Sequence, residues 1–239
     1  MDNRPIGFFD SGRGGLTCVK ALKEILPDEN IIFYADTARC PYGVRSASEL
    51  CAITDEILNY LKNRNVKAIV VACGTLSTVA SEVIRNFDIK TFSVYEPAVN
   101  AMRCLKGDKA LAVLGTKATV ESGAFQNAIG KGLNREIFGI ACQDFVQLCE
   151  SGHTDADDPL VKEAVERYLS GIKGKVDAVL LGCTHFGLLD DAIKNYLPGV
   201  ETVSASREAA KQLANYLIEN DMTGGEGAEE IICSGYEIC

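Results

Sequence analysis

Short apolar runs alternate along the chain with longer segments in which apolar residues recur at helical spacing. The runs at 6–9, 31–35, 66–72 and 176–182 are apolar nearly throughout and lack the polar alternation of a half-exposed strand. Such strands are typical of parallel sheets that are covered by helices on both faces. The pattern therefore predicts an α/β fold with mainly parallel sheets.

The remaining elements follow from the same periodicities and from the positions of glycine and proline. Further strands are expected at 91–95, 110–114, 136–140, 201–203 and 230–233. Helices are expected at about 16–25, 46–63, 77–85, 98–105, 159–172, 188–197 and 206–219. Another opens in the turn 115–119 and runs through Ala128, and a helical segment that follows 141–145 ends at Glu150. Ligands bind at the carboxyl ends of parallel strands. The polar residues expected at those ends are Asp10, Ser11, Asp36, Tyr42, Cys73 and Thr75.

One strand pattern occurs twice. The run at 66–72 leads into Cys73-Gly74-Thr75, and the run at 176–182 leads into Cys183-Thr184-His185. The repeat indicates two similar α/β domains, related by a pseudo-twofold axis, with an active site in the cleft between them. The strand-end cysteines would face each other there. The last helix and strand must pack on one copy or the other.

Composition narrows the classes of partner and compartment. The net charge of −9 argues against nucleic acid or an anionic membrane as the main partner, although backbone N–H groups can still hold a small anion. No signal segment opens the chain, and no apolar run approaches the roughly 18 residues of a membrane helix. The expected compartment is the cytoplasm. A homodimer is possible on general grounds, because isologous dimers are common.

Cysteine is abundant, with ten residues, but histidine occurs only twice and no Cys-x-x-Cys pair exists. A zinc site is therefore poorly supported, and a disulfide scaffold is not expected without secretion. Most of the cysteines are interpreted as small buried hydrophobes. That interpretation is also the alternative for Cys73 and Cys183.

Three features favour chemistry at Cys73 and Cys183. Each ends a strand, each is followed by a threonine within two residues, and each lies near a helix N-terminus, a setting that favours a thiolate. His185 can carry the proton of Cys183 or can be structural. Two opposed thiols suit inversion at a Cα, where a base removes a proton on one face and an acid returns one on the other. Asp10 and Glu150 are the carboxylates best placed to assist one thiol each.

The glycine-rich turn at 10–15 is a separate candidate. It lacks the Gly-Lys-Ser/Thr ending of a phosphate loop, and its glycine spacing does not fit the dinucleotide fingerprint. A structural turn is therefore the simpler interpretation, although Asp10 and Ser11 at a strand end favour a site.

The chain resembles the cofactor-independent glutamate racemases of the aspartate/glutamate racemase superfamily. The matching segments occur in family order over nearly the whole chain. They are Phe9-Asp10-Ser11-Gly12, Gly14-Gly15-Leu16-Thr17, Asp36-Thr37-Ala38-Arg39, Pro41-Tyr42-Gly43, Ala72-Cys73 with Thr75, Glu96-Pro97, Gly115-Thr116 with Thr119, and Gly182-Cys183-Thr184-His185-Phe186.

The resemblance implies an enzyme that makes D-glutamate from L-glutamate for peptidoglycan, without pyridoxal phosphate or a metal. Cys73 would act on the D-enantiomer with the help of Asp10, and Cys183 on the L-enantiomer with the help of His185 and Glu150. The implied substrate-binding residues are Asp10, Ser11, Pro41, Tyr42, Gly43, Gly74, Thr75, Thr116, Thr119, Thr184 and His185. The last helix would return to the N-terminal domain, which divides the chain into 1–97 with 206–239 and 98–205.

Three departures from the family pattern bear on the substrate and the fold. Gly74 stands where the family usually has an asparagine, whose side chain would hydrogen-bond the substrate, and Gly187 stands where it usually has a proline. The closing helix that customarily follows the last strand is also missing. The alternatives are a racemase or decarboxylase relative that acts on aspartate, a hydantoin, a malonate or another small acid, and a weakly active binding protein.

Overall fold

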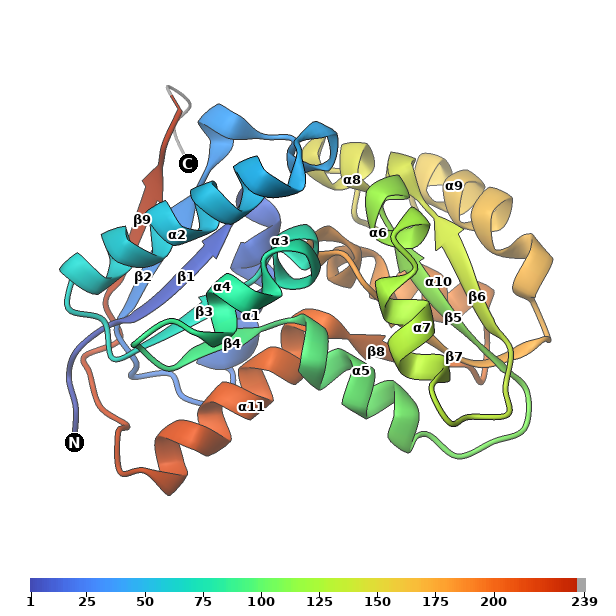
Figure 1. Cartoon of the computed structure of the whole chain (residues 1–239). Coiled ribbons are helices and arrows are strands. Elements are labelled where there is room, and N and C mark those ends of the chain that lie inside the picture. The colour runs from blue at the N-terminus through green and yellow to red at the C-terminus, as the bar shows by residue number, and fades with distance from the viewer. Residues whose placement is uncertain (236–239) are drawn as a thin grey trace. The chain divides into compact units, whose positions relative to one another are not determined.

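The computed structural model describes residues 1–235 and contains two compact units (Figure 1). The first unit is Met1–Tyr95 with Ser206–Cys239, and the second is Glu96–Ala205. Each unit is an α/β layer structure built on its own sheet of parallel strands, as the run of apolar segments predicted. Within residues 1–235, no helix combines the length and the hydropathy that crossing a membrane requires.

The first unit holds a five-stranded sheet in the order β4-β3-β1-β2-β9, in which every neighbouring pair is parallel. Its strands are β1 (Ile6–Asp10), β2 (Ile31–Ala35), β3 (Ala68–Val71), β4 (Thr91–Ser93) and β9 (Glu229–Cys233). The central strands β1 and β3 are buried at every residue, which explains why β3 and the first four residues of β1 are continuously apolar. The C-terminal strand β9 completes the sheet at the free edge of β2.

Two groups of helices cover this sheet. The helices α2 (Ala47–Asn63), α3 (Gly74–Val79) and α4 (Ser81–Arg85) share one apolar cluster with the strands. Ser46 caps α2, and Glu49 returns the capping bond, so the long helix begins where its sequence signal lies. The helices α1 (Leu16–Lys23) and α11 (Ala205–Glu219) pack together, with the Cys18 thiol 3.4 Å from the Ser206 carbonyl oxygen.

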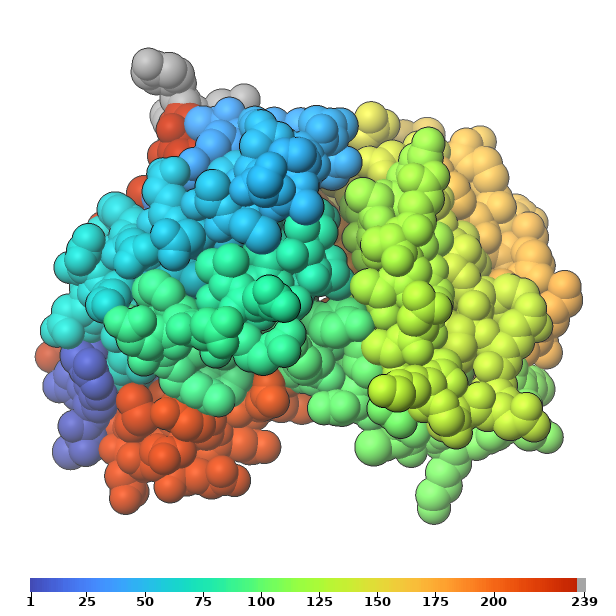
Figure 2. All heavy atoms as spheres, in the orientation of Figure 1, coloured from blue at the N-terminus to red at the C-terminus, as the bar shows by residue number. Residues whose placement is uncertain are grey.

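The second unit holds a four-stranded parallel sheet in the order β6-β5-β7-β8. Its strands are β5 (Ala110–Gly115), β6 (Ile137–Ala141), β7 (Val176–Leu181) and β8 (Glu201–Ser204). The helices α8 (Gln143–Glu150), α9 (Pro159–Leu169) and α10 (Asp190–Tyr196) share one apolar cluster with β5 and β7. The helices α6 (Lys117–Glu121) and α7 (Ala124–Gly130) pack against β6 and form the yellow-green surface of this unit in Figure 2. The helix α5 (Tyr95–Cys104) leads into β5.

The two sheets repeat one strand order. The first four strands of each unit lie in the order second, first, third, fourth: this is β2-β1-β3-β4 in the first unit and β6-β5-β7-β8 in the second. Each central strand is the first strand of its unit, and the strand that precedes each candidate cysteine is the third. The prediction of two similar α/β units with parallel sheets is confirmed.

Several predicted boundaries were wrong, each for a local reason. The helix expected at 77–85 begins at Gly74 and is divided at Ala80, so it consists of α3 and α4. The helix expected through Ala128 is interrupted by Gly123, whose φ of 65° is left-handed. The strand expected at 91–95 ends at Ser93, because Tyr95 already begins α5.

Candidate active site

Cys73 and Cys183 occupy equivalent backbone positions in their units. Cys73 lies two residues beyond β3, and Cys183 lies two residues beyond β7. The residue before each cysteine donates its N–H to the central strand: Ala72 to the Phe9 oxygen at 2.9 Å, and Gly182 to the Leu114 oxygen at 2.8 Å. Each cysteine is therefore held beside the carboxyl end of its central strand, where a parallel sheet presents a ligand site.

Cys73 is buried and forms the N-cap position of α3, so the helix starts with Gly74 and Thr75 directly after the thiol. The Ser77 hydroxyl donates to the Cys73 carbonyl oxygen at 2.8 Å, which fixes the backbone of the cysteine against the first turn. The predicted substrate residues Gly74 and Thr75 lie half-buried in that turn. The early start of α3 thus places backbone N–H groups of the helix next to this thiol.

Asp10 is the last residue of β1 and is only 2% exposed. Its carboxylate accepts the Ser11 N–H at 2.8 Å, and the register of β1 against β3 places it beside Ala72, the residue before Cys73. Gly15 packs on both neighbours, because an added Cβ would lie 2.7 Å from the Asp10 Cβ and 3.1 Å from the Ala72 Cβ. The glycine-rich turn therefore has a packing function that closes the loop over Asp10.

Cys183 lies beside an imidazole and a carboxylate. Its sulfur is 3.8 Å from His185 Nδ1, and His185 Nε2 is 3.6 Å from a Glu150 carboxylate oxygen. The second distance is within ion-pair range but longer than a hydrogen bond. His185 is 9% exposed, and its Nε2 has no hydrogen-bond partner among residues 1–235. The structure thus brings together the three residues that the sequence grouped around the second thiol.

Two further cysteines lie near Cys183 and differ from it in their surroundings. Cys142 is fully buried at the start of α8, and the Cys149 thiol donates to the His185 carbonyl oxygen at 3.4 Å. Burial raises the pKa of Cys142 to about 12 and the pKa of Cys149 to about 12. These two thiols stay protonated at neutral pH and behave as the small apolar residues that the sequence predicted.

Tyr42 begins a single 3-10 turn (Tyr42–Val44) in the loop that follows β2, between the exposed Pro41 and Gly43. Its side chain is 2% exposed and packs in the same apolar cluster as Cys73. The hydroxyl donates to an Asp36 carboxylate oxygen at 2.5 Å, and the Arg39 guanidinium donates to the same oxygen at 2.7 Å. Burial raises the pKa of Tyr42, and the hydrogen bond to Asp36 raises it further, so the group remains a phenol. Asp36 was expected at a strand end but received no role from the sequence.

The predicted threonines of the second unit lie at the ends of its strands. Thr116 follows β5 and caps α6, and its hydroxyl is 3.0 Å from the Thr119 hydroxyl. Thr184 follows Cys183 and is 7% exposed. Thr116 corresponds to Ser11 in the repeat, because each residue directly follows the central strand of its unit. Hydroxyl groups therefore stand at matching places in both units.

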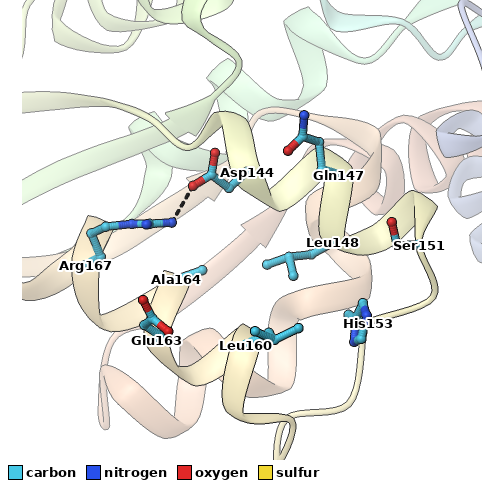
Figure 3. A pocket seen from close by; sticks show the side chains of 9 residues that line it. All are labelled: Asp144, Gln147, Leu148, Ser151, His153, Leu160, Glu163, Ala164 and Arg167. Atoms are coloured by element: carbon cyan, nitrogen blue, oxygen red, sulfur yellow. Dashed lines mark hydrogen bonds and ion pairs between the residues drawn. The ribbon is translucent and has the colours of Figure 1, made fainter.

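A pocket of about 380 Å³ lies between α8 and α9 (Figure 3). The residues Asp144, Gln147, Leu148 and Ser151 line it from one face of α8, and an ion pair of Asp144 with Arg167 lies at one end. Cys149 and Glu150 project from the other faces of the same helix, because successive helical residues are 100° apart. Neither candidate cysteine lines this pocket.

Within the described part of the chain, no group of three or more His, Cys, Asp or Glu side chains could hold a metal ion.

Comparison with known proteins gives matches that span most of the chain. The family model described as Asp/Glu/Hydantoin racemase matches residues 16–213. A glutamate racemase from Aquifex aeolicus is 42% identical over 220 residues, which cover 92% of this chain and 85% of the relative. A glutamate racemase structure from Thermus thermophilus in complex with β-chloro-D-alanine is 37% identical with a TM-score of 0.84, and the match covers 98% of this chain and 88% of that one. A glutamate racemase structure from Francisella tularensis in complex with D-glutamate is 33% identical with a TM-score of 0.87, and the match covers 100% of this chain and 90% of that one.

Proposed function

The chain belongs to the Asp/Glu/Hydantoin racemase family, and we propose that it interconverts L- and D-glutamate with Cys73 and Cys183 as its acid–base pair. Membership confirms the family resemblance that the sequence motifs indicated, and the chain is an isomerase of the racemase type. The assignment of Cys73 and Cys183 as the acid–base pair rests on one observation: the two cysteines occupy the same backbone position in their units. Two thiols at the same backbone position of two similar units are a natural source of one base and one acid.

The reaction balances with a single proton in transit on each side. With D-glutamate, the Cys73 thiolate removes the Cα proton and becomes a thiol. The Cys183 thiol then protonates the opposite face and becomes a thiolate, which gives L-glutamate. Reversal starts from the Cys183 thiolate. The enzyme leaves each turnover with the opposite thiol charged, so a proton must be exchanged with solvent before the same direction repeats.

The groups beside each thiol support its two charge states. Asp10, next to the residue that precedes Cys73, can accept and release a proton on that side. His185 lies 3.8 Å from the Cys183 sulfur and can do the same on the other side. Glu150, 3.6 Å from the imidazole, can form an ion pair with the ring while the ring carries the proton. We propose these roles for Asp10, His185 and Glu150 because of their position beside the thiols.

Substrate binding is proposed for the polar groups at the strand ends of both units. In the first unit these are Asp10, Ser11, Pro41, Tyr42, Gly43, Gly74 and Thr75, and in the second they are Thr116, Thr119, Thr184 and His185. Hydroxyl and backbone N–H groups can hold two carboxylates and stabilise the charge that develops when the Cα proton leaves. Two relatives support the ligand class, since one was solved with D-glutamate and one with β-chloro-D-alanine.

The assembly and the compartment are further proposals. We propose that the two units are the two domains of one enzyme, divided at 1–97 with 206–239 and 98–205. A homodimer in the cytoplasm is the proposed state, supported by the family resemblance and by the frequency of isologous dimers.

Cα exchange in D2O tests the proposed function directly. Incubation with L-glutamate should give deuterium at Cα, seen as loss of the Cα–H signal by proton NMR, and D-glutamate, seen by circular dichroism. Cys73→Ala and Cys183→Ala should each abolish racemisation while the fold, followed by far-UV circular dichroism, stays unchanged. If folded wild-type protein exchanges no Cα proton of glutamate, the substrate assignment is wrong. If each alanine variant still racemises, the two-thiol mechanism is wrong for any substrate.

Aspartate is the matched alternative substrate, because Gly74 removes a side-chain contact that the family usually has. The same exchange experiment with L-aspartate decides between the two acids. A larger kcat/KM for aspartate than for glutamate would identify a racemase of a different small acid with the same thiol pair.

A further inference from the structure

Asp36 is a fully buried carboxylate, at 0% exposure, that the proposed reaction does not use. It follows β2 directly, at the same carboxyl end of the strands as Asp10 and Cys73. One of its oxygens accepts the Tyr42 hydroxyl at 2.5 Å and the Arg39 guanidinium at 2.7 Å. The other accepts the Ser234 hydroxyl at 2.8 Å. Burying a carboxylate is costly unless its oxygens accept hydrogen bonds, and both oxygens of Asp36 accept them from neighbouring residues.

Ser234 comes from the far end of the chain and makes several bonds to the same turn. It follows β9, whose last residue Cys233 is in register with Ala35 of β2. Ser234 donates its N–H to the Ala35 oxygen at 3.0 Å, and its hydroxyl accepts the Ala38 N–H at 3.1 Å. Gly235 then donates to the Thr37 hydroxyl at 3.0 Å. The end of β9 therefore fixes the turn that leads to Tyr42.

The Tyr42 hydroxyl has one proton, and that proton goes to Asp36. The hydroxyl is thus not available as a donor to a substrate. What Tyr42 can do is hold the loop: its ring is buried in the cluster that contains Cys73, while Pro41 and Gly43 on either side are exposed. The backbone of this loop is then the part that meets the substrate.

We propose that Ser234 and Asp36 are positioning residues: Ser234 orients Asp36, Asp36 anchors Tyr42, and Tyr42 fixes the loop 41–43 that receives the substrate beside Cys73. This inference rests on the proposed function for the substrate role of the loop. It assigns the C-terminal strand a part in the site, through a hydrogen bond between residues 198 positions apart. Neither the sequence motifs nor the thiol mechanism requires such a link.

A merely structural role for Ser234 makes a different prediction, because β9 is anchored independently elsewhere. The strand pairs with β2 over five residues, from Glu229 to Cys233. Glu230 also forms an ion pair with Arg64 at 2.5 Å, and Lys23 donates to the Gly227 oxygen at 2.9 Å. Ser234→Ala removes only the side-chain bonds at the site end of the strand. Glu230→Gln weakens the attachment of the same strand away from Asp36 and is the matched control.

Steady-state kinetics in both directions provide the first test. Ser234→Ala should raise KM for L- and D-glutamate about tenfold, the loss expected for one hydrogen bond to a charged group, with kcat changed much less. Ser234→Thr, which keeps the hydroxyl, should restore KM. Glu230→Gln should leave KM unchanged, with the melting temperatures of both variants recorded. An unchanged KM in Ser234→Ala, or an equal rise in Glu230→Gln, would overturn the positioning role.

A double-mutant cycle tests the order of the chain of contacts. If Ser234 acts through Asp36 and Tyr42, then Ser234→Ala combined with Tyr42→Phe should raise KM by far less than the product of the two single effects. If KM in the double variant rises by the full product of the two single effects, the two side chains act separately, which contradicts the proposal.

Hydrogen–deuterium exchange separates this inference from the proposed function. In Ser234→Ala the amides of residues 36–45 should exchange faster than in wild type, whereas Glu230→Gln should leave them unchanged. This measurement needs no turnover, so it tests the link even if glutamate proves to be the wrong substrate. Unchanged exchange in Ser234→Ala would overturn the inference whatever the activity shows.

Discussion

The contact of His185 with Glu150 gives the sharpest quantitative prediction. The imidazole nitrogen and the carboxylate oxygen are 3.6 Å apart, a separation at which two unit charges interact by about 5 kcal/mol at an effective dielectric constant of about 20. The Glu150 side chain is 57% exposed, however, and exposed pairs are screened to about 0.2–1 kcal/mol. Glu150→Gln should therefore lower kcat/KM by only about 1.4- to fivefold. His185→Asn removes the proton carrier itself and should cost about 100-fold, at the lower end for a proton-transfer group.

Isotope effects locate the affected step. If the changes act on Cys183, which is proposed to remove the proton of L-glutamate, His185→Asn should increase the primary isotope effect with α-deuterated L-glutamate. With D-glutamate the same variant should show a larger solvent isotope effect, because return of the proton by Cys183 has become slower. The double variant should lose little more than His185→Asn alone, since Glu150 acts through the imidazole.

Two results would refute this reasoning. A loss in Glu150→Gln as large as in His185→Asn would mean that screening does not decide the strength of the pair. Near-wild-type kcat/KM in His185→Asn would mean that the imidazole next to the thiol is structural. Measurements of kcat/KM by circular dichroism, with melting temperatures as the folding control, distinguish both cases.

Three further predictions address the departures and the packing. Gly74→Asn should raise kcat/KM for glutamate about tenfold by adding one substrate hydrogen bond, and no rise would show that this contact does not limit the enzyme. Gly15→Ala should cost about 1–3 kcal/mol in the free energy of unfolding and lower activity, because the new Cβ would overlap Asp10, whereas Gly12→Ala meets nothing within 4 Å and should be close to neutral in both assays. Lys67→Ala leaves the buried Glu29 carboxylate without its cation, so the free energy of unfolding should fall by about 3–5 kcal/mol and the melting temperature should drop. The value of kcat/KM, measured well below that temperature, should stay near wild type.

The parts of the fold that the sequence predicted are those with a strong local signal. The strand β3 and the first four residues of β1 read as unbroken apolar runs, and the helical spacing of apolar residues predicted α2. Breaks inside helices were missed, since they depend on single backbone conformations such as the left-handed φ of Gly123. The start of α3 at Gly74 was missed for a related reason, because glycine is a poor helix former and carries no start signal.

The candidate site was predictable where its residues lie next to a strand end. Cys73, Cys183 and His185 could be found in this way, because a strand end and its following turn are local features of the sequence. The network around Asp36 could not, since its donors come from Tyr42 in a loop and from Ser234 at the other end of the chain. Ser234 reaches Asp36 only because β9 pairs with β2 at that edge of the sheet. The five residues of β9 do not specify the edge at which the strand joins.

The repeat also explains why the two thiols have different partners. Asp36 donates its N–H to the Asp10 oxygen at 2.9 Å, and Cys142 donates its N–H to the Gly115 oxygen at 2.9 Å, so these residues correspond in the two units. The first unit thus has carboxylates where the second has Gly115 and Cys142. A side chain at Gly115 would crowd the start of α6, because its Cβ would lie 3.1 Å from the Thr119 methyl carbon. The groups that we propose to assist Cys183 lie instead in the following turn and on α8, as His185 and Glu150.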